Sequence, residues 1–214
     1  MSKLGDDIYR AMRHDIVFGK LEAQSKIRLS NLKDTYGASV PTLREILNRL
    51  VSEGFVLAEG QRGHIVTPMS AEGLREIADL RILLESSALE KSIQRGDLNW
   101  EERIISAHYR LAQMEKQMLT GEDEVREAWK KYDWEYHQAL ISACGSSELL
   151  SLHGITFDKY LRYQMRLLTF RGEVAADEHK HMRDAALDRD ADAAVALLRA
   201  HILGGVEHSL QLFR

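Results

Sequence analysis

The 214-residue sequence predicts a mainly α-helical protein with a small N-terminal domain that contains a β-hairpin and a C-terminal antiparallel six-helix bundle. Long segments carry apolar residues at helical spacing, and only two prolines, Pro41 and Pro68, interrupt the chain. The charge balance also changes at Pro68. Residues 1–69 hold ten Lys and Arg against eight Asp and Glu, and residues 70–214 hold 19 against 25. We therefore expect one domain over residues 1–69 and a second over residues 70–214.

The composition is that of a soluble globular protein, with 44% hydrophobic and 29% charged residues. No run of eighteen apolar residues occurs, and the first residues lack the apolar segment of a signal peptide. The single cysteine, Cys144, has no partner for an internal disulfide. We expect a cytoplasmic protein that does not contact a membrane.

The first seventy residues begin with two predicted helices. Apolar residues from Ile8 to Val17 recur at helical spacing, and Gly19 is a natural stop, so the first helix is expected over about 6–18. The segment RLSNLKDTYG follows as a short helix that ends at Gly37.

A third helix and a hairpin complete this domain. Ser39 is a good N-cap, Pro41 falls in the first turn, and an apolar stripe runs from Leu43 to Val51 before Gly54 ends the helix. The runs FVLA and HIVT, joined by EGQRG, predict a β-hairpin.

This order of elements is the layout of a winged helix-turn-helix domain, whose second motif helix enters a major groove of DNA. The face opposite the apolar stripe and the tip of the wing carry side chains suited to phosphates and base edges. The alternative is that Arg49 pairs with Glu45 on the helix surface and that Arg62 is a solvated turn residue. The residues expected to contact DNA are Ser39, Thr42, Arg44, Asn48, Arg49, Arg62, Gly63 and His64.

The segment YGASVPTLREILNRLVSEGFVLAEGQRGHIV resembles the winged-helix domain of GntR-type bacterial transcription regulators. The chain departs from the family pattern where Val40 replaces an Arg and where Pro41-Thr42 reverses a Thr-Pro pair, which leaves the operator sequence open. The matching residues are Gly37, Ser39, Arg44, Glu45, Leu47, Leu50, Glu53, Gly54 and Gly63.

The second domain is expected to hold six helices with short connections. The first begins at the cap Ser70 and runs to Gly96. The breaks that follow are rich in Gly or Asp, and the interior of such a bundle is a usual place for a metal or ligand site. The remaining helices are expected over about 98–119, 122–143, 147–169, 173–188 and 190–213.

Four polar residues are candidates for a metal site inside this bundle. Asp133 and His137 are four positions apart and share one helix face. His179 precedes apolar positions at helical spacing, so it points inward and His181 outward, while His201 is embedded in an apolar stripe. Three imidazoles and a carboxylate suit Zn²⁺, or alternatively Ni²⁺. The alternative is a surface pair of Asp133 with His137 and two histidines that hydrogen-bond elsewhere.

Residues 74–201 resemble the all-helical FCD effector domain of the FadR-type branch of GntR regulators, in its six-helix, VanR-like form. The resemblance implies that the four polar residues bind a metal and that the metal helps to hold a small carboxylate effector. It implies that Arg81 neutralises this effector, and Arg162 and Tyr163 are weaker candidates from their helix position. The matching residues are Arg81, Leu84, Glu85, Asp133, Tyr136, His137, Glu178, His179 and His201.

These observations predict a DNA-binding transcription regulator, a repressor released by a small organic acid, that binds a pseudo-palindromic operator as a homodimer. Two alternatives are a sensor of the metal ion itself and a mononuclear metal hydrolase. We expect no enzyme, because His-Glu-x-x-His does not occur and a di-iron centre needs two Glu-x-x-His pairs where this chain has one, Glu178 with His181.

Overall fold

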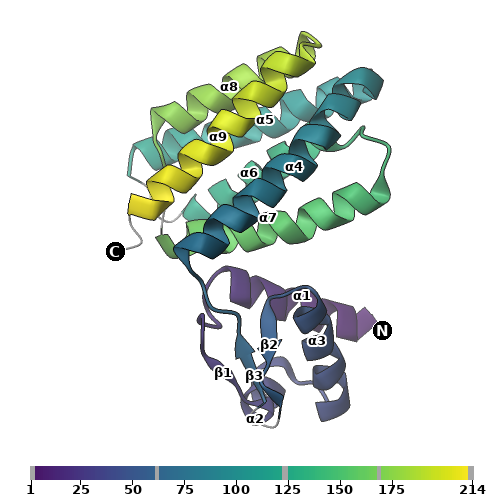
Figure 1. Ribbon diagram of the computed structural model, residues 1–214, viewed down its shortest axis with the longest axis vertical. Helices are drawn as coiled ribbons and strands as arrows, with labels where there is room; N and C mark the ends of the chain where they lie inside the picture. Colours follow the sequence, from purple (N-terminus) through teal and green to yellow (C-terminus); the bar gives the residue numbers. More distant parts are fainter. Residues whose placement is uncertain (1–2, 61–62, 122–124, 168–169, 212–214) are drawn as a thin grey trace. The chain divides into compact units, whose positions relative to one another are not determined.

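A computed structural model describes residues 3–60, 63–121, 125–167 and 170–211 (Figure 1). Contacts between residues divide the chain into two units, Met1–Leu74 with Leu161–Arg166, and Arg75–Tyr160 with Leu167–Arg214. We call them the N-terminal and the C-terminal unit. The domain boundary expected between residues 69 and 70 stays a prediction, because one helix runs across the division.

The N-terminal unit has the predicted helices and hairpin, with one addition. The three strands form an antiparallel sheet in the order β1-β3-β2, in which Lys26 pairs with Ile65 and Val56 pairs with Val66. The short strand β1 was not expected from the sequence. The elements are α1 Lys3–Val17, β1 Lys26–Ile27, α2 Leu29–Tyr36, α3 Val40–Ser52, β2 Val56–Ala58 and β3 His64–Val66.

Helix α3 forms as its sequence dictates. Ser39 is the N-cap, and its hydroxyl accepts a hydrogen bond from the Thr42 amide at 3.3 Å. Pro41 lies in the first turn, where its missing N–H costs nothing. Leu43, Ile46, Leu47 and Leu50 are fully buried, so this stripe forms the core of the unit and leaves the opposite face of α3 outward.

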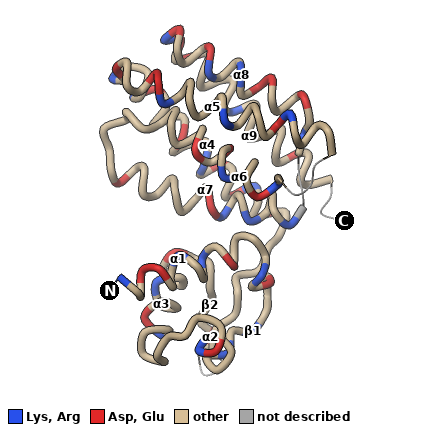
Figure 2. The backbone as a smooth tube through the Cα atoms, turned by 180° about the vertical axis from the view of Figure 1, so that it is seen from behind, with Lys and Arg blue, Asp and Glu red and all other residues tan. Residues whose placement is uncertain are grey.

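The C-terminal unit is built from six helices among the described residues, as predicted. Acidic and basic residues are interspersed along them (Figure 2). None of the helices in the described part of the chain is long and apolar enough to cross a membrane. The helices are α4 Ala71–Arg95, α5 Leu98–Leu119, α6 Arg126–Ile141, α7 Ser147–Leu167, α8 Glu173–Leu187 and α9 Ala191–Gln211.

The interior of this bundle combines apolar packing with an unusual number of polar groups. Trp100, Phe157 and Leu198 are buried in its core, and so are charged side chains and histidines that normally lie at the surface. Such groups need partners when they leave water. The buried polar and charged residues of the bundle are Arg81, Glu85, Ser92, His108, Glu115, Lys130, Asp133, His137, His153, Thr156, His179, His201 and Ser209.

Candidate metal centre

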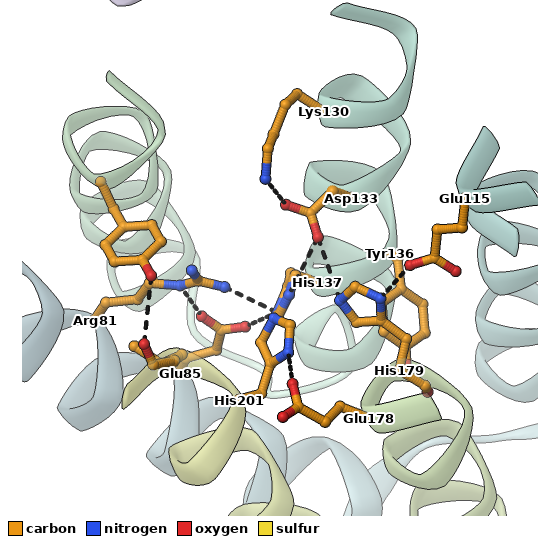
Figure 3. A network of polar contacts seen from close by, with 12 residues as sticks. Arg81, Glu85, Glu115, Lys130, Asp133, Tyr136, His137, Glu178, His179 and His201 are labelled. Carbon is orange, nitrogen blue, oxygen red and sulfur yellow. Dashed lines mark hydrogen bonds and ion pairs between the residues drawn. The ribbon is translucent and has the colours of Figure 1, made fainter. Parts of the chain in front are cut away.

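The structure brings the four predicted metal ligands together inside the bundle (Figure 3). Asp133 and His137 come from α6, His179 from α8 and His201 from α9. One ligand atom from each lies within 4.8 Å of all the others, and the four residues are between 0% and 8% exposed. A surface pair of Asp133 with His137 is therefore not what the chain forms, and the group is compact enough for one ion.

Each of the three imidazoles is held from behind by a carboxylate. The Nδ1 atom of His137 donates to Glu85 on α4. The Nδ1 atom of His179 donates to Glu115 on α5 at 2.6 Å. The Nδ1 atom of His201 donates to Glu178 on α8 at 2.7 Å. Because a carboxylate only accepts, each ring carries a proton on Nδ1, which leaves Nε2 as the atom that can bind an ion once it has no proton of its own. The Nε2 atoms of His137 and His179 both face Asp133.

The centre leaves polar atoms that a cation would satisfy. The Nε2 atoms of His137 and His179 are buried and have no hydrogen-bond partner among the described residues. They lie 3.7 Å and 3.4 Å from the same Asp133 oxygen, Oδ1. Buried polar atoms without partners are costly, and the donor set of three nitrogens and one oxygen is typical of zinc sites. The residues therefore fit a divalent ion.

Burial and neighbouring charges set the proton state of each ligand. Burial lowers the pKa of His137, and burial together with nearby His179 lowers the pKa of His201 to about 3. Burial would also lower the pKa of His179, but the carboxylates of Asp133 and Glu115 raise it to about 9. His137 and His201 are thus neutral at pH 7, the form that binds metals.

The fourth ligand is paired with a buried cation. Lys130, one turn before Asp133, places Nζ 3.4 Å from the second carboxylate oxygen, Oδ2. Burial would raise the pKa of Asp133, but Lys130 and His179 hold it well below its usual range. Burial lowers the pKa of Lys130 in turn. Asp133 therefore stays a carboxylate that can coordinate through Oδ1.

The expected effector residues lie in two different places. Arg81 is 1% exposed, and its Nε donates to Glu85 at 2.8 Å, so it lies behind His137. Arg162 and Tyr163 lie on α7 in the N-terminal unit. Arg162 donates to the Thr67 carbonyl at 2.6 Å, and the Tyr163 hydroxyl accepts from the Ser70 amide at 3.5 Å. These two residues belong to a different unit from the four ligands, and their role stays a prediction.

Most of the residues expected to contact DNA lie on the outward face of α3. Arg44 and Asn48 are exposed, and Thr42 is half-buried beside the cap Ser39, whose hydroxyl lies 2.9 Å from that of Thr42.

Arg49 is exposed, but it is engaged within the domain. Its guanidinium lies 3.6 Å from the centre of the Tyr9 ring. Its Nε donates to Glu53 at 3.2 Å, and its Nη1 lies 3.4 Å from Asp6. The helical ion pair of Arg49 is therefore made with Glu53 and not with Glu45.

The wing residues are only partly described. Gly63 has a φ of 93°, which favours glycine, and His64 begins strand β3. Arg62, which was expected to contact DNA, lies outside the described residues.

Several side chains that contact the four ligands or their carboxylate partners were not expected from the sequence. Glu115 follows Leu111 by one turn and shares its buried stripe, which was a usable signal. Lys130 stands one turn before Asp133 on the same face. His153 and Arg171 had no such signal. His153 pairs with Glu85, which is distant in the chain, and Arg171 pairs with Glu178 through a contact that only the folded structure shows.

Comparisons with known proteins agree with this architecture. Residues 76–204 match the FCD domain family, and residues 4–66 match the family described as bacterial regulatory proteins, gntR family. The chain is 37% identical to the uncharacterized HTH-type transcriptional regulator BphR of Paraburkholderia xenovorans over 91% of this chain and 80% of BphR. It is 31% identical to the HTH-type transcriptional repressor GlaR of Escherichia coli, over 92% and 91% of the two chains.

A solved structure shows the same fold over its whole length. The Escherichia coli protein McbR/YncC matches with a TM-score of 0.82 at 16% identity, covering 100% of both chains. The matching families and curated relatives are transcription regulators and not enzymes. The chain therefore belongs to the GntR family of bacterial transcription regulators and carries an FCD domain behind its DNA-binding domain.

Proposed function

We propose that the FCD domain holds a divalent metal ion at Asp133, His137, His179 and His201, and that the state of this centre controls how tightly the winged helix binds its operator. The observation that carries the proposal is the orientation of the three imidazoles. Each Nδ1 donates to its own carboxylate, so each ring can offer Nε2 to one point beside Asp133.

Zn²⁺ is the ion that we propose, and Ni²⁺ is the alternative. Both accept imidazole nitrogen and carboxylate oxygen, and the choice between them depends on geometry and on metal supply in the cell. A bound ion supplies open coordination positions that oxygen atoms of a small molecule can complete.

The ligand that we propose for these positions is a small organic acid. Lys130 lies beside Asp133 and adds positive charge at the centre. Arg81 stays a proposal for neutralising this acid, and its contacts with Glu85 at 2.8 Å and with Nδ1 of His137 at 3.1 Å put its charge beside the centre. Arg162 and Tyr163 stay proposals for this role and need a test, since their contacts lie in the N-terminal unit.

The regulator is proposed to be a cytoplasmic repressor that binds a pseudo-palindromic operator as a homodimer. An acid that binds one arrangement of the bundle more tightly than another shifts the population between them and thereby changes operator affinity. The relative GlaR is a transcriptional repressor, which supports this sign of control. On the DNA side we propose the N-cap Ser39, then Thr42, Arg44, Asn48 and Arg49 of α3, and Arg62, Gly63 and His64 of the wing.

A second function is favoured by one observation. The four ligands are at most 8% exposed, so the centre is closed to solvent. Three histidines and one aspartate can also fill the tetrahedral shell of a zinc ion and leave no open position, which is typical of sites that bind only the ion. The protein would then sense the metal without an acid.

One experiment separates the two. An operator is first selected from genomic fragments, and its affinity for metal-stripped protein is measured by fluorescence anisotropy. Zinc is then added alone and with a panel of small carboxylates. Release that needs both zinc and one acid supports the effector proposal, and release by zinc alone supports metal sensing. Operator affinity that responds to neither would refute both.

A further inference from the structure

Glu85 differs from the other two carboxylates that accept from the histidines, because it contacts two histidines and each of the others contacts one. It is fully buried on α4, and its two oxygens contact histidines of two different helices. One oxygen accepts from Nδ1 of His137 on α6, and the other accepts from Nε2 of His153 on α7 at 3.0 Å. Figure 3 shows Glu85 between Arg81 and His137.

Arg81, also on α4, completes a buried polar group that consists of Arg81, Glu85, His137 and His153. Its Nε donates to Glu85 at 2.8 Å, and its guanidinium lies 4.3 Å from the ring centre of Phe157 and 4.8 Å from that of Tyr160, both on α7. The four polar side chains of this group are at most 1% exposed. A buried ion pair that loses one partner leaves an uncompensated charge, so these residues must move together.

The other two carboxylates hold their histidines locally. Glu115 on α5 contacts His179, and Glu178 on α8 contacts His201 and the nearby Arg171. Among the described residues, neither is joined by a hydrogen bond or ion pair to α4 or α7.

Helices α4 and α7 are special because each contributes residues to both units. The first turn of α4, up to Leu74, and residues Leu161–Arg166 of α7 belong to the N-terminal unit. Glu85 therefore joins His137, a proposed metal ligand, to the two helices that contribute residues to both units.

We propose that Glu85 is a positioning residue that orients His137 for the ion and transmits occupancy of the centre to α4 and α7. This inference rests on the proposed metal site. A shift of His137 onto an ion acts on Glu85 as well, because breaking the bond between them would leave two buried polar groups without this partner. Glu85 in turn holds Arg81 on α4 and His153 on α7.

The test compares hydrogen exchange in the full-length protein with and without zinc, by mass spectrometry. The variant combines Arg81→Met with Glu85→Gln, which removes both charges of the buried pair and keeps side chains of similar size. The matched control is Glu178→Gln, which removes the carboxylate behind His201. Circular dichroism establishes that each variant folds, and zinc affinity is measured by competition with a chromophoric chelator.

In the wild-type protein, zinc should slow exchange in α4 and α7 as well as in α6, α8 and α9. Both variants should bind zinc about 10- to 100-fold more weakly, since each loses a group that orients a ligand. At saturating zinc, the control should keep the slowed exchange in α4 and α7, whereas the double variant should lose it there and keep it in α6, α8 and α9. A folded double variant that binds no zinc would also support the positioning role, because its four ligands are unchanged.

The inference fails if zinc slows hydrogen exchange in α4 and α7 of the double variant as much as in the wild type. It also fails if wild-type protein binds zinc and exchange in α4 and α7 does not slow. Wild-type protein that binds no zinc would instead remove the proposed metal site. If the double variant does not fold, Glu85→Asp replaces it with the same expectations, because it keeps the charge and withdraws the carboxylate from His137.

Discussion

At the scale of single residues, neighbours decide what each histidine of the FCD domain does. Burial lowers the pKa of an imidazole, and for His201 burial together with the charge of nearby His179 brings the pKa to about 3. His179 is equally buried, yet two carboxylates raise its pKa to about 9. The same side chain is thus a neutral ligand in one position and a cation that balances Asp133 in the other while the metal is absent.

The metal ligands can be tested by a pair of histidines on one helix. His179 is buried at the centre, whereas His181, two residues later, is exposed. At a zinc concentration about 100-fold above the dissociation constant, binding should stabilise the wild-type protein by about 2.7 kcal/mol. His179→Ala should lose most of this gain and His181→Ala should keep it, as measured by thermal melting. Equal gains in both variants would place the ion elsewhere.

His108, which is not one of the four proposed metal ligands, predicts a pH dependence of the free energy of unfolding. Burial, aided by Arg183, lowers its pKa from 6.5 to about 4. Its Nδ1 atom lies 3.1 Å from Arg183 Nη1, and the ring packs edge-on against Tyr136. The charged groups that act on it from α8 are His179, Lys180, Arg183 and Asp184.

The direction in which pH changes the free energy of unfolding follows from proton binding by His108. Below pH 6.5 the unfolded chain takes up a proton at His108, and the folded protein does so only near pH 4. The free energy of unfolding should therefore fall as the pH drops through this window, by up to about 1.4 kcal/mol per pH unit from this residue. His108→Gln should show a shallower fall in urea titrations between pH 7 and about 4. Parallel curves would contradict the assignment.

The residues of the centre show what a sequence can predict. Asp133 and His137 were recognisable because they share a helix face, and His201 because it stands in an apolar stripe. Glu115 was missed because a lone glutamate is usually exposed, and only the fold reveals that its partner is His179. The role of Arg81 toward an effector stays a prediction, and its ion pair with Glu85 on the next turn was not expected from the sequence.

At the scale of elements, helices were predictable to within a few residues because their ends carry local signals. The expected range 98–119 agrees with α5, whose N-cap Asp97 accepts from the Trp100 amide at 3.0 Å. Strand β1 was missed because Lys26–Ile27 is too short to show an alternating pattern. It forms only because Ile65 and His64 of β3 offer it an edge.

The cap of α3 gives a prediction about one element. Ser39→Ala removes the acceptor for the Thr42 amide at the start of the helix that is expected to enter the DNA groove. The free energy of unfolding should fall by about 1 kcal/mol in a denaturant titration. Ser30→Ala is the control, since Ser30 lies inside α2 and caps no helix end there. If Ser30→Ala lowers the free energy of unfolding as much as Ser39→Ala does, the hydrogen bond of the cap does not stabilise the protein.

At the scale of the whole molecule, the distribution of charge limits how the regulator binds DNA. The first 69 residues have a small excess of basic residues, and the rest of the chain is acidic. Affinity for DNA must then come from a few placed cations and not from a general positive field. Two copies of the winged helix on a two-fold operator would double these contacts.

Arg44 is an exposed cation on the outward face of α3 and is our candidate for a contact with DNA phosphate. If it contacts a phosphate in each half-site, Arg44→Ala should weaken operator binding and reduce the slope of log affinity against log salt by about 2 for a dimer, one per copy. Arg199→Ala, an exposed arginine on α9, should change neither quantity. Anisotropy titrations at several salt concentrations measure both. A weaker affinity with an unchanged slope would assign Arg44 to base edges. Unchanged affinity would remove it from the DNA interface, because the loss of a cation bonded to phosphate or base weakens binding.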